Sequence, residues 1–312
     1  MLHSLLTTLA EAPNPLEHVV NQAGYKNAQG YWIWSGNQGT LVLSGLILIV
    51  VGLWVASKIK TGDKSQGAEA YVTKNRFAHF IEMIVVYLRD DVVRPLLPDR
   101  TERFMPFLLT IFFFVLVNNL LGLTPIRDLL HNVLGIHNDW VGGTATQNIW
   151  VTGALALVSG IIFNVAAIVR LGPVGFVKHM MGGLPWYMFP IALLLLAIEA
   201  AGQFIIKPGA LALRLFANMT GGHVLMATLL GYAGVALAEA AAHGGWGKEG
   251  AITLISAGSV FLLTFLELLV AVIQAFVFMF LTTIFISLMD HHDEHGHEHG
   301  HDHASGHEHA HA

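Results

Sequence analysis

Long apolar runs separated by short polar stretches make up most of the chain. Three of these runs, 41–57, 104–123 and 147–169, have the length of a single membrane crossing, because about 20 apolar residues in a helix span the hydrocarbon core of a bilayer. The pattern therefore predicts that residues 41–289 form a membrane domain built from helices.

Two further runs are too long for one upright crossing. Residues 184–232 form an apolar stretch interrupted by Pro190 and Pro208, and residues 251–289 form one with neither proline nor a turn cluster. A helix over the whole second run would be about 58 Å long, whereas the hydrocarbon core is about 30 Å thick. The predicted fold class is therefore an all-α integral membrane protein with about five membrane-embedded helices, of which the last two are long and steeply tilted.

The composition agrees with this class and excludes others. The chain is 54% hydrophobic and only 12% charged, whereas about a quarter of the residues in a soluble domain are charged. It contains no cysteine, which excludes disulfide bonds, thiolate metal sites and cysteine nucleophiles.

The basic residues predict the orientation of the membrane domain. Nine of them lie between the first two apolar runs, and Arg170 and Lys178 follow the third run, but the opposite side has only three, Lys26, Arg127 and Lys248. By the positive-inside rule, residues 1–40 form an extracytoplasmic segment and the C-terminus is cytoplasmic. Residues 77–103 mix apolar and charged side chains, which is typical of an amphipathic helix on the membrane face.

The C-terminal tail, 290–312, differs in composition from everything before it, with ten of the 18 histidines. The segment HEHGH at 297–301 matches the zinc-protease pattern HExxH, but this pattern needs an ordered helix and the tract is broken by Gly and Ser. The tail is a weak candidate for metal binding through His297, His299 and His301. A loose metal-binding or buffering tail and an inert solvated tail both stay open.

Polar residues inside the apolar runs are the main functional candidates, because an ionisable group in a membrane span is costly. The ionisable ones are Glu199, Lys207, Arg214, His223 and Glu267, and the neutral ones are Asn118, Asn119, Asn164, Gln203, Asn218 and Gln274. Arg214 cannot release its proton at any accessible pH. Its charge must therefore be balanced by a partner, by water or by a moving ligand.

Spacing along the predicted helices groups these candidates. Arg214 and Asn218 are four residues apart and share a face, as do Glu267 and Gln274 at seven, whereas His223 points away from Arg214. His223 and Glu267 both titrate, and an antiparallel hairpin would let them share a proton. Small residues surround Arg214, so that a neighbouring helix can approach closely.

Each candidate also has a structural interpretation. Lys207 can be an interfacial anchor, and Glu199 can be a partner of Lys207 or of Arg214. Asn118, Asn164 and Gln274 can be ordinary hydrogen-bonding residues between helices. His223 and Glu267 can be an inert buried pair.

Two of the apolar runs carry a family resemblance. The stretch LALRLFANMTGGH, 211–223, resembles the arginine helix of subunit a of the F-type ATP synthases, and ELLVAVIQAFVFMFLTTIFI, 267–286, resembles the last helix of that family. NLLGLTP at 119–125 and TQNIWVTGALAL at 146–157 are weaker similarities. The resemblance extends over residues 75–289 in the same order.

The resemblance implies a non-catalytic, proton-translocating stator subunit beside a ring of c subunits, in which two offset half-channels lead protons to and from the ring carboxylates. It assigns proton translocation to six residues, Arg214, His223, Glu267, Gln274, Asn218 and Glu199. It implies b-type peripheral stalk subunits and the rest of the complex as partners, a bacterial plasma (inner) membrane, no cofactor and no nucleic acid. Glu199 lies eight residues before Lys207, whereas the family spacing is seven.

Two other classes of function remain as alternatives. A metal-cation transporter with a His-rich tail needs paired Asp and His ligands inside the spans, where His223 is the one histidine in the apolar runs. An intramembrane metalloprotease needs its HExxH pattern inside a span, and here the pattern lies in the tail.

Overall fold

The computed structural model describes residues 23–26, 29, 32–59, 73–124, 141–182, 188–243 and 247–288. A short antiparallel hairpin, β1 (Ala23–Lys26) and β2 (Trp32–Ser35), precedes the first helix. The helices that follow are α2 (Gly36–Lys58), α3 (Arg76–Tyr87), α4 (Thr101–Leu123), α6 (Ile149–Met180), α7 (Phe189–Ala201), α8 (Lys207–His243) and α9 (Lys248–Leu288). Five helical stretches of the described part are long and apolar enough to cross a membrane. The predicted all-α membrane fold is therefore confirmed.

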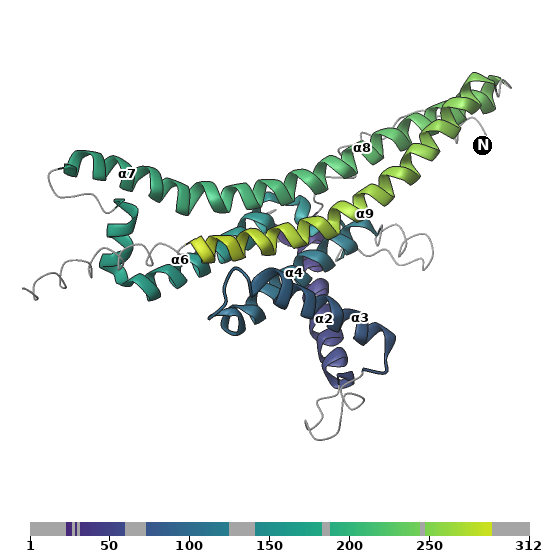
Figure 1. Cartoon of the computed structure of the whole chain (residues 1–312). Helices are drawn as coiled ribbons and strands as arrows, with labels where there is room; N and C mark the ends of the chain where they lie inside the picture. The colour runs from purple at the N-terminus through teal and green to yellow at the C-terminus, as the bar shows by residue number, and fades with distance from the viewer. Residues whose placement is uncertain are drawn as a thin grey trace, which may run out of the picture.

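The last two of these stretches dominate the shape. The chain is helical from Phe189 to Ala240 through α7 and α8, and Figure 1 shows the two as one continuous curved ribbon with α9 running back beside α8. A helix of this length measures about 78 Å, more than twice the roughly 30 Å of a hydrocarbon core. Figure 1 also shows α2 running across the direction of α8 and α9. Helices this long fit within a bilayer only at a steep angle.

The two prolines expected to interrupt the run 184–232 do not break the helix. Pro190 lies in the first turn of α7, where no backbone N–H is needed. Pro208 follows η6, a π-helical turn over Gly202–Ile206 in which the Lys207 N–H bonds to the Gly202 carbonyl, five residues back. This wider turn changes the hydrogen-bonding register just before the proline, so α8 continues from α7.

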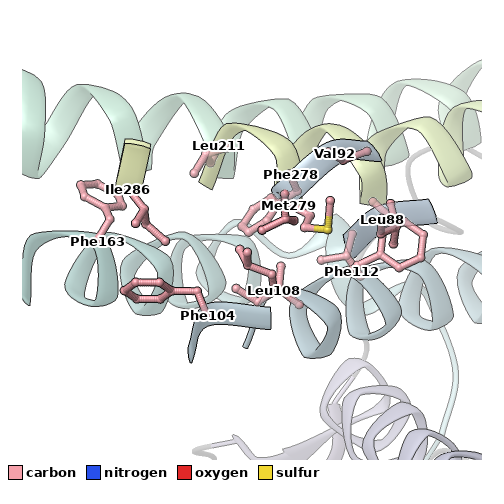
Figure 2. Packing of buried hydrophobic residues seen from close by; sticks show 14 of the residues in the cluster. Leu88, Val92, Phe104, Leu108, Phe112, Phe163, Leu211, Phe278, Met279 and Ile286 are labelled. Atoms are coloured by element: carbon pink, nitrogen blue, oxygen red, sulfur yellow. The ribbon is translucent and has the colours of Figure 1, made fainter. Parts of the chain in front are cut away.

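The largest hydrophobic core lies where α4, α6, α8 and α9 meet. Figure 2 shows the side chains of this cluster pointing toward one another: Leu88, Val92, Phe104, Leu108, Phe112, Phe163, Leu211, Phe278, Met279 and Ile286. Lipid is as apolar as these residues, so close packing rather than escape from water holds the helices together. The core keeps α8 and α9 in register with the shorter helices.

The amphipathic helix expected over 77–103 differs from the structure. Helix α3 ends at Tyr87, a π-turn, η3, follows over Leu88–Val93, and α4 begins at Thr101. Pro95 and Pro98 explain the break, because proline lacks the N–H that an α-helix requires and restricts the residue before it. Leu97 is fully buried in the core, so this half of the segment packs against the helix bundle, and the location of the segment on the membrane face stays a prediction.

Charged residues of the same segment stay at its exposed side. The Arg89 side chain donates two hydrogen bonds to the Asp90 carboxylate, at 2.9 and 3.0 Å. These bonds, together with the charges of Arg89 and Arg94, hold the pKa of Asp90 below its ordinary value. The segment therefore carries a local charge network at the edge of the membrane domain.

Two further bounds differ from those expected. The first crossing, predicted over 41–57, begins at Gly36, because Ser35 and Gln38 form a capping box around a polar first turn. The third, predicted over 147–169, continues to Met180 through a kink at Gly172, which has a φ of +71° and precedes Pro173. The His-rich tail, with His297, His299 and His301, lies outside the described residues, as do residues 1–22.

Candidate functional site

The antiparallel pair α8 and α9 carries most of the polar residues singled out in the sequence. They form three groups along α7 and α8: Glu199 at the end of α7 with Lys207 at the start of α8, Arg214 with Asn218 further along α8, and His223 closer to the connection with α9. Each group meets different neighbours.

Arg214 lies on an open face of α8. Its side chain is exposed, and so are Ala210, Ala217 and Gly221 at helical spacing on the same side. Among the residues that the structure describes, none forms an ion pair or hydrogen bond with the Arg214 guanidinium. A fixed positive charge thus projects from a face whose small side chains allow another helix to approach closely.

Asn218, one turn beyond Arg214, connects this face to α9. Its Nδ2 donates a hydrogen bond to the Gln274 Oε1 at 2.9 Å. Gln274 is buried, so this bond between helices sets the register of α8 against α9 beside the arginine. Sequence spacing placed Arg214 and Asn218 on one face, and the structure brings Gln274 to the same place.

His223 and Glu267 lie together further along the hairpin. The His223 Nε2 is 3.9 Å from the Glu267 Oε1. The Glu267 side chain is buried, and neither carboxylate oxygen accepts a hydrogen bond from a described residue. The carboxyl group packs against the α8 backbone at Gly222, where the Cβ of any larger residue would lie 2.9 Å from the Glu267 Cδ. A side chain at position 222 would therefore displace the Glu267 carboxyl group from its place at this crossing of the two helices.

Two residues that the sequence analysis did not single out complete this group, Thr144 and Thr146. The Thr144 Oγ1 is 3.2 Å from the His223 Nε2, and the Thr146 Oγ1 donates to the Asn119 Oδ1 at 3.1 Å. Asn119 in turn donates to the Ala271 carbonyl of α9 at 3.4 Å. The signal in the sequence was weak: Thr144 directly follows Gly142 and Gly143, and Thr146 is the first residue of one of the weaker family similarities.

The segment that carries these threonines is attached to the start of α2. The Gly142 N–H donates to the Gly36 carbonyl at 3.4 Å, and the Thr40 Oγ1 donates to the Gly143 carbonyl at 3.1 Å. Gly143 has a φ of +80°, a conformation that glycine adopts without strain. The polar group around His223 is thus built from α2, α4, the 141–147 segment, α8 and α9.

The third group lies where α7 becomes α8. Lys207 forms an ion pair with Glu199 at 3.8 Å and a hydrogen bond with Gln203, and its ammonium lies 5.5 Å from the centre of the Phe285 ring. Of the two partners left open for Glu199, the structure therefore selects Lys207. Eight residues of α-helix would rotate the pair by about 80°, but the π-turn between them absorbs one residue and restores the facing orientation.

Two of the candidate asparagines do not join these groups. Asn118 and Asn164 donate to carbonyls of their own helices, Phe114 and Gly160. The described residues also contain no set of three His, Cys, Asp or Glu side chains that could hold a metal ion. The cation-transporter and metalloprotease alternatives are thus unsupported in this part of the chain.

Comparison with known proteins identifies the family. The sequence profile described as "ATP synthase A chain" matches residues 39–287. The chain is 35% identical to ATP synthase subunit a of Chloroherpeton thalassium over 81% of this chain and 66% of the relative. It is 37% identical to ATP synthase subunit a of Myxococcus xanthus over 72% and 65%, and 32% identical to ATP synthase subunit a 2 of Chlorobaculum tepidum over 81% and 62%.

The match covers nearly all of the membrane domain, although this chain spans no more than about two thirds of the length of these relatives. It includes Arg214, the His223–Glu267 pair and both long helices. The chain is a multi-pass membrane protein that belongs to the ATP synthase A chain family.

Proposed function

We propose that this chain forms two offset half-channels beside a ring of c subunits, and that it passes protons to and from the ring carboxylates, coupling a proton gradient to rotation. The observation that carries the proposal is the position of Arg214. It is a permanent cation without a partner among the described residues, on an exposed face of small side chains.

The charge of Arg214 accounts for the coupling. A ring carboxylate that comes to face the guanidinium is favoured in its charged form and releases its proton. The same positive charge repels a proton that would pass directly from one half-channel to the other. Protons can then cross only by travelling with the ring. The small residues Ala210, Ala217 and Gly221 leave room for ring helices to move past.

The polar groups on either side of Arg214 correspond to the two half-channels. His223 is nine residues beyond Arg214 and Lys207 is seven before it, so they lie roughly 13 Å and 10 Å away along the helix at 1.5 Å per residue. His223 and Glu267 belong to the half-channel on the α8–α9 connection side, and Glu199 to the one at the opposite end. Asn218 and Gln274 hold the two helices together between them.

The distribution of basic residues along the chain supports an orientation of the subunit in the membrane. Residues 1–40 face the outside and the tail 290–312 faces the cytoplasm of a bacterium, in whose plasma (inner) membrane the protein resides. The c-subunit ring, the b-type peripheral stalk subunits and the rest of the ATP synthase are its partners. On its own the chain catalyses no reaction, since the chemistry of ATP synthesis belongs to other subunits.

Single cysteines test the contact with the ring, because the chain has no native cysteine. Ala217→Cys places a thiol on the Arg214 face, and Val174→Cys places an exposed thiol on α6 as a matched control. With cysteines along the outer helix of the c subunit, oxidation of membranes should cross-link position 217 and not position 174. Equal cross-linking of both positions, or none at 217, would refute the proposal.

A further inference from the structure

We propose that Thr144 is a positioning residue whose hydroxyl fixes the tautomer and orientation of His223, so that the protonated Nε2 of the imidazole is held beside Glu267. The inference deepens the proposed function, because it assumes that His223 and Glu267 carry protons. It assigns a role to a residue outside the two long helices.

The hydrogen bonds of one hydroxyl determine the tautomer. The Thr144 Oγ1 lies 3.3 Å from the Gly122 carbonyl and 3.2 Å from the His223 Nε2. A carbonyl only accepts, so the Thr144 hydroxyl makes both hydrogen bonds at once only when its single proton goes to Gly122. The oxygen is then left to accept, and the His223 Nε2 must be the donor. The neutral imidazole therefore carries its proton on Nε2 and leaves Nδ1 as the acceptor.

The same nitrogen faces the carboxyl group. The Glu267 Oε1 is 3.9 Å from the His223 Nε2, which is too long for a hydrogen bond. The Thr144 hydroxyl therefore accepts the Nε2–H and holds the ring in place, with Nε2 close to the carboxylate but not bonded to it. Without that anchor, rotation of the ring would present Nδ1 to Glu267 as readily as Nε2.

Tight packing keeps the hydroxyl where it is. Thr144 is almost completely buried. It packs against Gly122, where the Cβ of any larger residue would lie 2.9 Å from the Thr144 Cβ. The backbone just before Thr144 is attached to α2, because the Thr40 hydroxyl donates a hydrogen bond to the Gly143 carbonyl. The anchor of His223 is thus attached to α2 and α4, independently of any movement between α8 and α9.

Proton passage then follows a balanced sequence. A proton arriving from the aqueous side forms a bond to the His223 Nδ1, and the ring becomes an imidazolium. The Nε2–H bond breaks and an O–H bond forms on Glu267, either through one water or after a small approach of the side chains. The ring is then neutral with its proton on Nδ1. It resets when Nδ1–H gives that proton to a water and Nε2 takes one from a water, and the Nε2–H tautomer is favoured because only that form donates a hydrogen bond to Thr144.

The experiment compares three variants in the intact ATP synthase, in inverted membrane vesicles. Thr144→Val removes the hydroxyl at almost constant volume, and Thr144→Ser retains it. Thr152→Val is the control, since Thr152 is equally buried and its hydroxyl bonds only to carbonyls of its own helix and cap. ATP-driven proton pumping is divided by the amount of assembled complex. If Thr144→Val does not assemble, the smaller Thr144→Ala replaces it.

We expect Thr144→Val to pump up to roughly 100-fold more slowly, the loss that displacement of a reacting group by about 1 Å can cause, with Thr144→Ser and Thr152→Val within about twofold of wild type. In a His223→Ala background the same Thr144→Val change should have no further effect, because its target is gone. The inference is overturned if Thr144→Val pumps at the wild-type rate, or if Thr144→Ser pumps as slowly as Thr144→Val. It is also overturned if Thr144→Val slows pumping by the same factor in the His223→Ala background as in the wild type. Wild-type pumping by His223→Ala would instead overturn the proposed proton route itself.

Discussion

His223 and Glu267 lie 3.9 Å apart across the α8–α9 hairpin, beside Gly222, against which the Glu267 carboxyl group is packed. Neither residue has the other as a neighbour in sequence or on its own helix. The pair exists because α9 returns antiparallel to α8 and because Gly222 lets the Glu267 carboxyl group approach the α8 backbone.

Exchanging the members of this pair tests whether they act together. His223→Ala and Glu267→Ala should each slow ATP-driven proton pumping strongly. His223→Glu alone and Glu267→His alone should also pump slowly. The double variant that carries both changes should recover much of the lost rate, because it restores one acid beside one imidazole. Two independent structural residues would instead leave the double variant at least as impaired as the worse single one. Pumping rates per assembled complex decide between the two outcomes.

Arg214 should tolerate no replacement. Arg214→Ala, Arg214→Gln and Arg214→Lys should abolish ATP-driven proton pumping while the subunit still inserts and assembles, because the residue is exposed and forms no hydrogen bond or ion pair with a described residue. Lysine keeps a charge but is compact and can lose its proton when desolvated, so it should not restore pumping fully. Pumping at the wild-type rate by Arg214→Ala would contradict the mechanism.

Gly222 should be replaceable only with a loss of function. In Gly222→Ala the added methyl group overlaps the Glu267 carboxyl group and displaces it from His223. Gly231→Ala, in the same helix with open space around it, should be neutral or stabilising by up to about 1 kcal/mol, since alanine is the better helix former. We expect a large loss of pumping for the first variant alone, and equal rates for both would show that the close approach is unimportant.

The π-turn between α7 and α8 should tolerate the removal of one residue. Deleting Ile205 places Glu199 seven residues before Lys207 and lets a regular α-helix replace the turn, so that the ion pair is kept. Deleting Met226, in a regular part of α8, rotates the rest of that helix by about 100° against α9. Complex assembly and pumping should be nearly intact in the first variant and lost in the second. Equal damage in both would mean that the turn does not absorb the extra residue.

The His-rich tail should be dispensable for coupling. Removal of residues 291–312 should leave ATP synthesis driven by a proton gradient nearly unchanged in metal-free buffer, because a solvated tract contributes nothing to the half-channels. Binding of Zn²⁺ or Ni²⁺ to the purified complex should fall with the deletion if the tail binds metal. Loss of proton transport on deletion would give the tail a role in the channel itself.

Some features of the fold could be predicted from local pattern. Apolar runs of membrane length show which segments enter the bilayer, and the absence of proline between residues 251 and 289 predicted the continuous helix α9. The predicted ends of the helices were less accurate where a capping residue or a proline, rather than the apolar run, determines where the helix begins or ends. Ser35 begins α2 before the apolar run, and Pro95 and Pro98 turn the chain into the core.

The sequence by itself determined the class of protein and the chemistry available: a permanent cation, an imidazole and carboxyl groups placed in apolar helices, with Arg214 and Asn218 on one face. Only the tertiary structure decided which of these groups meet. Helical periodicity defines the direction of a side chain about its own axis, but contacts between segments depend on how closely backbones approach. The approach at Gly222, the attachment of Thr144 to α2 and α4, and the π-turn that aligns Glu199 with Lys207 follow from packing in three dimensions, which no local pattern encodes.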